Sequence, residues 1–267
     1  MIKLIAIVLD GTLLDDRKIV SVNNQKAISE CIKQNVKIAI VTGRPLIGIE
    51  KVLKKYSFYK ELIVASNSGS YIEDLYTNSS ISKSTLEIDD YIKIRSLIKE
   101  KEITITAYTE DSIFTIDEKP NNEAILDSKI LKLNIKPFER LKQSVNQEIS
   151  RINIMGSKEY LDKVLPYLLS KFNNKYKVIR NEYFSIEILN REVGKDKAIE
   201  KIIEYLNIAK KEVMTIGDGM NDIEMIKEYG IGVAMENSSD YVKSKCDFIT
   251  LSNNNDGVSY AIKKLLN

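Results

Sequence analysis

Two apolar segments that each end in an acidic, glycine-containing turn constrain the fold of this chain more than any other feature. The first, Ile5-Ala6-Ile7-Val8-Leu9, leads into Asp10-Gly11-Thr12. The second, Val213-Met214-Thr215-Ile216, leads into Gly217-Asp218-Gly219-Met220-Asn221-Asp222. Almost wholly apolar strands are typical of a parallel sheet that is covered on both faces. Because open α/β sheets bind ligands at the carboxyl ends of their strands, the two turns predict a site at that edge.

The residue types in these turns indicate what the site binds. Clustered carboxylates suit Mg²⁺, and glycines let the backbone come close to a bound phosphate. Asp218 is the strongest metal candidate, because a short Gly-Asp-Gly turn lets a carboxylate face a cation at about 2.1 Å. The simpler interpretation is that Asp10-Gly11 is only a turn and that Asn221-Asp222 caps a helix that begins at Ile223. The presence of both turns in one chain favours the functional interpretation.

The first eighty residues have the pattern of an open α/β sheet. Apolar strands are predicted over 2–9 and 36–41, with a helix between them that begins at Ser21 or Asn23. A strand, a helix and a strand in this order form a βαβ unit, which is almost always right-handed. Another helix and a strand over 62–65 follow. We therefore predict an α/β fold with a doubly wound, parallel, Rossmann-like core.

From about residue 83 the pattern changes to that of an α+β domain. Alternating polar and apolar residues over 103–108 and 112–116 predict a hairpin of a sheet with one wet face. Further elements are expected over 121–131 (helix), 151–155 (strand), 158–172 (helix), 176–179 (strand) and 184–189 (strand). The core pattern then returns with a helix over 197–206. The predicted organisation is a core in two parts, 1–82 and 190–267, with a cap domain, 83–189, inserted between them.

Four motifs in this order resemble those of the haloacid dehalogenase superfamily, specifically its Cof-type sugar-phosphate phosphatases. The first motif of that family reads Asp-x-Asp-Gly-Thr, and in this chain Val8 stands at its first position, which is the nucleophile of the family. Thr42-Gly43-Arg44 looks like the second motif, and Lys195 lies where the third motif has its lysine. The turn around Asp218 looks like the fourth motif. The resemblance covers most of the chain; the second and third motifs are persuasive only through their order.

The resemblance implies a role for each matching residue. Asp10 would protonate the leaving oxygen and later activate water, and its backbone carbonyl would bind Mg²⁺. The expected catalytic set is Val8 (the vacant nucleophile position), Asp10 and Lys195. The expected phosphate-binding set is Gly11, Thr42, Gly43, Arg44, Lys195 and Asn221. The expected metal ligands are Asp10, Asp218 and Asp222. The implied activity is Mg²⁺-dependent hydrolysis of small phosphorylated metabolites.

Val8 sets this chain apart from the family pattern. The family reaction passes through an aspartyl-phosphate, and valine has no lone pair with which to form one. Two interpretations remain open: a member that has lost turnover, or an altered copy of an active enzyme. The alternative class of function is a non-catalytic protein that binds a phosphorylated ligand. A nucleotide-binding domain of other ancestry is disfavoured, because no G-x-G-x-x-G follows the first strand.

Composition excludes several other classes of function. The 267 residues include 40 Lys and Arg and 38 Asp and Glu, a net charge of +2 that gives no case for nucleic-acid binding. The chain has no histidine, which removes serine-histidine catalysis and histidine metal sites, and two cysteines cannot form a disulfide framework. Without an apolar stretch of about 18 residues or a leader-like start, we expect a cytoplasmic protein with no membrane partner. We expect it to be a monomer or a weak homodimer.

Overall fold

The structure is a computed structural model that describes residues 1–100, 102–143, 148–172 and 174–266. Its chain forms two compact units, Met1–Lys83 with Gly194–Asn267, here called the core unit, and Ser84–Val193, here called the cap unit. The first boundary lies one residue beyond the predicted one, and the second lies after residue 193 rather than 189. The later boundary reflects a turn closed by a hydrogen bond from the Val193 amide to the Asn190 carbonyl.

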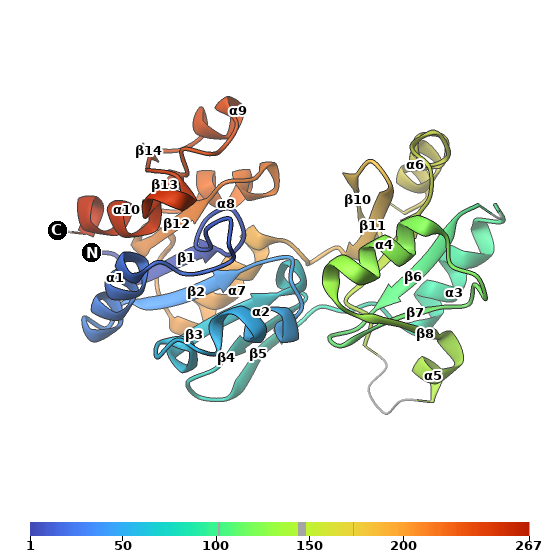
Figure 1. The fold of residues 1–267 in the computed structure, drawn as a ribbon, viewed down its shortest axis with the longest axis horizontal. Helices are drawn as coiled ribbons and strands as arrows, with labels where there is room; N and C mark the ends of the chain where they lie inside the picture. The colour runs from blue at the N-terminus through green and yellow to red at the C-terminus, as the bar shows by residue number, and fades with distance from the viewer. Residues whose placement is uncertain (101, 144–147, 173, 267) are drawn as a thin grey trace. The chain divides into compact units, whose positions relative to one another are not determined.

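The core unit is built on one eight-stranded sheet with the order β14-β13-β12-β1-β2-β3-β4-β5 (Figure 1). Its parallel strands are β1 (Leu4–Val8), β2 (Lys37–Val41), β3 (Leu62–Ser66), β12 (Val213–Gly217), β13 (Ile231–Ala234) and β14 (Phe248–Ile249). The predicted doubly wound parallel sheet is confirmed. Two antiparallel strands at one end of the sheet, β4 (Tyr71–Asp74) and the edge strand β5 (Ser79–Lys83), were not predicted. The sequence of β5 is mostly polar, which hides a strand from a search for apolar runs.

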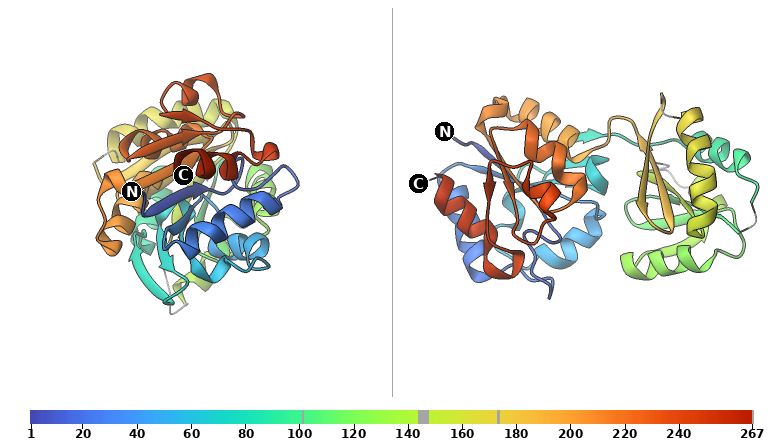
Figure 2. Two further views of the ribbon diagram at one scale, coloured as in Figure 1. Left: turned by 90° about the vertical axis from the view of Figure 1, so that its left-hand side faces the viewer. Right: turned by 90° about the horizontal axis from the view of Figure 1, so that it is seen from above.

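Helices cover both faces of this sheet, which explains why the central strands are apolar throughout. Ile5 and Ile7 of β1 belong to one buried cluster, and Leu4, Ala6 and Val8 belong to the other. The first cluster includes residues of α1 (Val22–Lys33), α2 (Leu46–Leu53) and α10 (Gly257–Leu266). The second includes residues of α7 (Lys195–Leu206), α8 (Ile223–Glu228) and α9 (Asp240–Lys243). Helices α1 and α10 lie side by side (Figure 2).

The start of α1 resolves one choice that the sequence left open. Ser21, not Asn23, is the N-cap, and its hydroxyl accepts a hydrogen bond from the Asn24 amide. Helix α7 begins at Lys195, two residues before the predicted start at 197. Gly194 with its extended backbone precedes the helix and Asp196 lies in its first turn, where an acidic side chain is favourable. The third-motif lysine is therefore the first residue of a helix.

The cap unit has a six-stranded sheet with the order β10-β11-β9-β6-β7-β8. Its strands are β6 (Thr104–Tyr108), β7 (Ser112–Thr115), β8 (Asn134–Pro137), β9 (Arg151–Met155), β10 (Tyr176–Glu182) and β11 (Ser185–Asn190). Its helices are α3 (Ile88–Leu97), α4 (Asn122–Leu131), α5 (Phe138–Lys142) and α6 (Lys158–Phe172). The β6–β7 hairpin is confirmed, whereas α3, β8 and α5 were not predicted.

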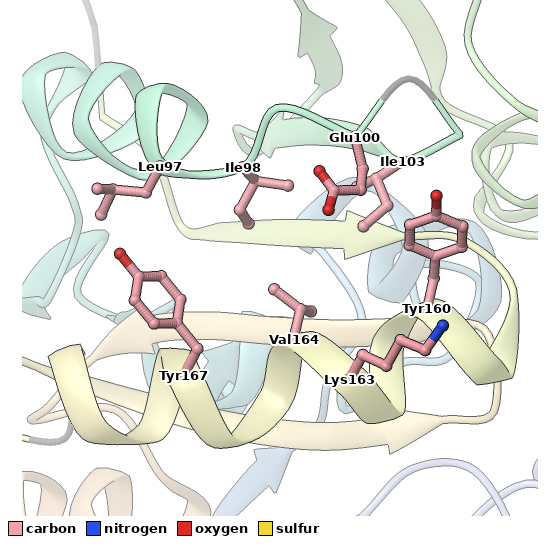
Figure 3. Close-up of a pocket in the computed structure, with 8 residues that line it drawn as sticks. All are labelled: Leu97, Ile98, Glu100, Ile103, Tyr160, Lys163, Val164 and Tyr167. Carbon is pink, nitrogen blue, oxygen red and sulfur yellow. The ribbon is translucent and has the colours of Figure 1, made fainter.

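One small cavity of about 220 Å³ opens on the cap unit between α3 and α6 (Figure 3). It is lined by Leu97, Ile98, Glu100, Ile103, Tyr160, Lys163, Val164 and Tyr167. None of the residues predicted to act in a phosphate site takes part in it. Within the described ranges, no helix combines the length and apolarity needed to cross a membrane.

Candidate functional site

The carboxyl edge of the core sheet gathers the motif residues. Strand β1 pairs with β2 on one side and with β12 on the other, all in parallel. Because parallel neighbours end at the same edge, the segment from Val8 to Gly11, the turn Thr42–Arg44 and the turn at Asp218 are brought together. The site expected from sequence therefore comes from three adjacent strands, and Lys195 joins it from the start of α7.

Asp218 lies directly against the first motif. The Thr12 hydroxyl donates a hydrogen bond of 2.6 Å to Asp218 Oδ1. Gly11 has a φ of +71°, and a Cβ added there would stand 2.2 Å from Asp218 Oδ2. Only glycine therefore allows this approach. Thr12 was not among the predicted site residues, although its place in the first motif was a usable signal.

The charge of Asp218 is only partly compensated. Burial raises the pKa of its carboxyl, and the negative charges of Asp222 and Asp10 raise it further. The Thr12 hydrogen bond and the charge of Lys195 act in the opposite direction but do not cancel the rise. A cation placed beside Asp218 would relieve this excess of negative charge.

Lys195 and Asp222 form a buried ion pair. Lys195 Nζ lies 2.5 Å from Asp222 Oδ1, and the two side chains are 8% and 1% exposed. The other oxygen, Oδ2, accepts hydrogen bonds from the amides of Asp218 and Gly219 at 3.0 and 2.8 Å. Asp222 thus holds the lysine and closes the fourth-motif turn. Asp222 is also the N-cap residue of α8, which begins at Ile223 as the simpler interpretation expects, but its side chain makes no capping hydrogen bond there.

Asp10 is bound by two cations. Arg44 donates through Nε and Nη2 to both carboxylate oxygens at 2.6 Å, and Lys18 Nζ donates to Oδ1 at 2.8 Å. Burial on its own would raise the pKa of the Asp10 carboxyl, but hydrogen bonds and charges from Arg44 and Lys18 hold it below its usual range. Lys18 was not predicted, since nothing in its spacing distinguishes it from the other lysines of the chain.

The remaining predicted residues lie around these groups. Thr42 is buried, and its hydroxyl accepts a hydrogen bond of 3.2 Å from the Arg44 amide across Gly43. Asn221 is exposed, and its Oδ1 would lie 2.7 Å from a Cβ added at Gly219. Asn237, which sequence reasoning missed, donates from Nδ2 to the Gly11 carbonyl at 2.9 Å.

The donor set can be tested for its fit to Mg²⁺. Across the described ranges, no three acidic, histidine or cysteine side chains are grouped so as to hold a metal ion. Asp10 and Asp222 are engaged by Arg44 and Lys195, which leaves Asp218 as the carboxylate with uncompensated charge. Mg²⁺ is often held by one or two carboxylates and several waters. Asp218 therefore fits as a magnesium ligand. The site has one carboxylate fewer than it would have with an aspartate at position 8.

Comparisons with known proteins decide the family. The family model for haloacid dehalogenase-like hydrolases matches residues 5–262. The chain belongs to this family. Its relatives in the family include the 5-amino-6-(5-phospho-D-ribitylamino)uracil phosphatase YcsE of Bacillus subtilis, 34% identical over 263 residues, which are 98% of this chain and 95% of that protein. YxeH of the same organism is 30% identical over 270 residues, with 100% and 99% coverage.

Solved structures agree with this assignment. A haloacid dehalogenase-like hydrolase from Bacteroides thetaiotaomicron superposes with a TM-score of 0.86 at 26% identity, covering 99% of this chain and 100% of that one. The family resemblance makes this haloacid dehalogenase-like chain a phosphoric monoester hydrolase by descent. The whole length of the chain takes part in the match, and the cap unit is included.

Proposed function

We propose that this haloacid dehalogenase-like protein binds a small phosphorylated metabolite, such as a sugar phosphate, together with Mg²⁺, and that Val8 occupies the position of the family nucleophile. Phosphatase turnover is then absent or severely reduced in this chain, because a valine side chain cannot accept a phosphoryl group. The name of YcsE, a phosphatase of a phosphorylated ribityl compound, supports the substrate class.

The observation that carries this proposal is the environment of Val8. It is the last residue of β1, is 4% exposed and packs in the same apolar cluster as Val41 and Ala65. A β-branched side chain suits a buried strand, so the fold does not need an acid there. The carboxylate nearest in sequence, Asp10, is bound by Arg44 and is not available as a replacement nucleophile.

We assign the following roles to the residues of this site. Lys195, Arg44 and the Thr42 hydroxyl would bind the phosphate oxygens. Mg²⁺, when held by Asp218 and the Asp10 carbonyl, would supply positive charge that offsets the charge of the phosphate. Arg44 and Lys18 hold the pKa of the Asp10 carboxyl low, so Asp10 could serve as an acid only after a bound phosphate has drawn these cations away.

The decisive experiment is the substitution Val8→Asp. We expect it to give Mg²⁺-dependent hydrolysis of sugar phosphates, while the Val8 protein stays near background. Removal of a nucleophile in another hydrolase cost about 10⁶ in rate, which sets the scale. Val8→Asn is the matched control, because the amide has the size of aspartate without its nucleophilic carboxylate.

Three outcomes are distinguishable in this assay. Robust turnover by carefully purified Val8 protein would contradict the proposed role of position 8. An inactive Val8→Asp protein that still binds phosphate would favour the non-catalytic binding protein. Failure of every variant to bind phosphate would reject a phosphate site at this edge of the sheet.

A further inference from the structure

Three of the four residues in the segment Ser66–Gly69, at the end of β3, have an uncommon backbone conformation. Asn67, Ser68 and Gly69 have φ angles of 47°, 59° and 95°, so three successive residues are left-handed. Glycine adopts this conformation freely, but other residues do so at a cost, and asparagine is among the most tolerant. Strain of this kind persists only where the surrounding structure fixes it, and it concentrates at functional sites.

This segment holds the second-motif turn through the backbone. The Asn67 amide donates to the Arg44 carbonyl at 2.9 Å, and the Ser68 amide donates to the Thr42 carbonyl at 2.8 Å. The Thr42 amide in turn donates to the Ala65 carbonyl at 3.0 Å. Three hydrogen bonds thus fix both ends of Thr42–Arg44 against the end of β3, and two of them require the left-handed residues to keep their conformation.

The same segment contacts the start of helix α7. A Cβ added at Gly69 would stand 2.9 Å from Ala198 Cβ and 2.9 Å from the Gly194 carbonyl oxygen. The Gly194 carbonyl accepts the first helical hydrogen bond, from the Ala198 amide at 2.8 Å. Lys195 is the first residue of this helix. Four residues therefore connect the turn that carries Arg44 to the helix that carries Lys195.

Two side chains of the segment, those of Ser66 and Asn67, cannot act on a substrate directly. Ser66 and Asn67 are 1% and 2% exposed. Neither Ser66 Oγ nor Asn67 Nδ2 has a hydrogen-bond partner in the part of the chain that the structure describes. Buried polar groups without partners are costly and call for an explanation. Because both side chains are enclosed by protein, they do not contact a bound ligand directly.

We propose that Ser66–Gly69 fixes the distance between the Thr42–Arg44 turn and Lys195, and that Asn67 is the positioning residue of this segment. Asparagine tolerates the left-handed backbone, and in this conformation the backbone amide of Asn67 bonds the Arg44 carbonyl, while Gly69 contacts the start of α7. The turn that carries Arg44 and the helix that carries Lys195 are then held at a fixed separation before a phosphate binds. This inference depends on the proposed phosphate site only for its binding readout.

The test compares three substitutions at left-handed asparagines. Asn67→Val disfavours the left-handed backbone, whereas Asn67→Gly allows it. The control, Asn78→Val, makes the same change at an exposed residue with φ 55° in the turn between β4 and β5. Amide hydrogen exchange is measured over 42–44 and 195–198, together with the dissociation constant for inorganic phosphate. We expect Asn67→Val to speed exchange in both segments and to weaken phosphate binding by about tenfold or more. Asn67→Gly should restore both, and Asn78→Val should change neither.

Other results would overturn the inference. Equal effects of Asn67→Val and Asn78→Val would mean that Asn67 contributes only to general stability. Unchanged exchange in Asn67→Val would remove the positioning role. If Asn67→Val does not fold, Gly69→Ala tests the same contact, because its Cβ would push the segment away from α7. If the parent protein binds no phosphate, the proposed function fails, and hydrogen exchange still decides whether the segment couples 42–44 to 195–198.

Discussion

Asp218 is the residue on which the electrostatics of the site depend. Asp10 and Asp222 each form an ion pair, whereas the partner of Asp218 is the neutral hydroxyl of Thr12. The pKa of Asp218 is raised by burial and by its acidic neighbours. The folded state therefore binds a proton at this carboxyl more tightly than the unfolded chain does, so stability falls as pH rises from the unfolded value toward the raised folded one.

The direction of this pH dependence leads to a prediction for the substitution Asp218→Asn. In the absence of divalent cations the variant should be more stable than the parent at neutral pH, because the buried charge is gone and the amide oxygen can still accept from Thr12. The advantage should shrink as the pH falls through the raised pKa of Asp218. Urea unfolding in EDTA at several pH values measures it. Asp89→Asn, at an exposed position, is the control, and an Asp218→Asn protein less stable than the parent at neutral pH would contradict the prediction.

At the scale of elements, the contact between the first-motif turn and the fourth-motif turn requires a glycine, Gly11, which has no side chain. Gly11 has a positive φ and lies under the Asp218 carboxylate. The two turns are adjacent because β1 and β12 are parallel neighbours in the sheet. The turn after β1 can therefore neither change its backbone nor gain a Cβ without moving Asp218.

We accordingly predict that Gly11→Ala destabilises the fold by roughly 1–3 kcal/mol from backbone strain, with a further loss from the clash with Asp218. Gly48→Ala is the matched control. Gly48 lies inside α2, and a Cβ there would meet its nearest atoms at 3.6 Å, so alanine should be neutral or stabilising by about 0.4–1 kcal/mol. The free energy of unfolding in urea distinguishes them. Equal stability of the two variants would mean that the Gly11 turn relaxes freely.

At the scale of the whole molecule, the cap unit has what an independently folding domain needs. It has its own buried clusters, with Tyr91, Phe138 and Tyr176 among the largest fully buried or nearly buried side chains. Its ends are tied together, because Asn190 Nδ2 donates to the Thr85 carbonyl at 2.9 Å. Domains with neighbouring ends and a core of their own tolerate excision and insertion.

We therefore predict that the segment 84–193, expressed alone, folds cooperatively. Circular dichroism and urea unfolding should give a single transition. Tyr91→Ala in the same segment should lose about 3–5 kcal/mol, since it removes a fully buried aromatic side chain whose hydroxyl bonds the Ile105 carbonyl. A segment without a cooperative transition would show that the core unit is needed for the cap unit to fold.

The sequence alone determined the core architecture and the family. Apolar strands that end in glycine-containing acidic turns can be recognised locally. Burial on both faces of a sheet selects apolar residues, and close backbone approach selects glycine. The motif order singled out Asp10, Thr42, Lys195 and Asp218 as candidate site residues without any structure. Elements with weaker patterns, such as the polar edge strand β5 and helix α3, could not be recognised in the sequence in this way.

Tertiary structure alone decided the partner of each charged group. Thr12 and Asp218 are 206 residues apart in the chain, and Lys18 was indistinguishable from the other lysines until the loop after β1 brought it to Asp10. The role proposed for Asn67 likewise depends on its backbone conformation and on its hydrogen bond to Arg44, which belongs to a different turn. Residue types record how local segments fold, but the pairing of charges is set by distances across the folded chain, which no local pattern contains.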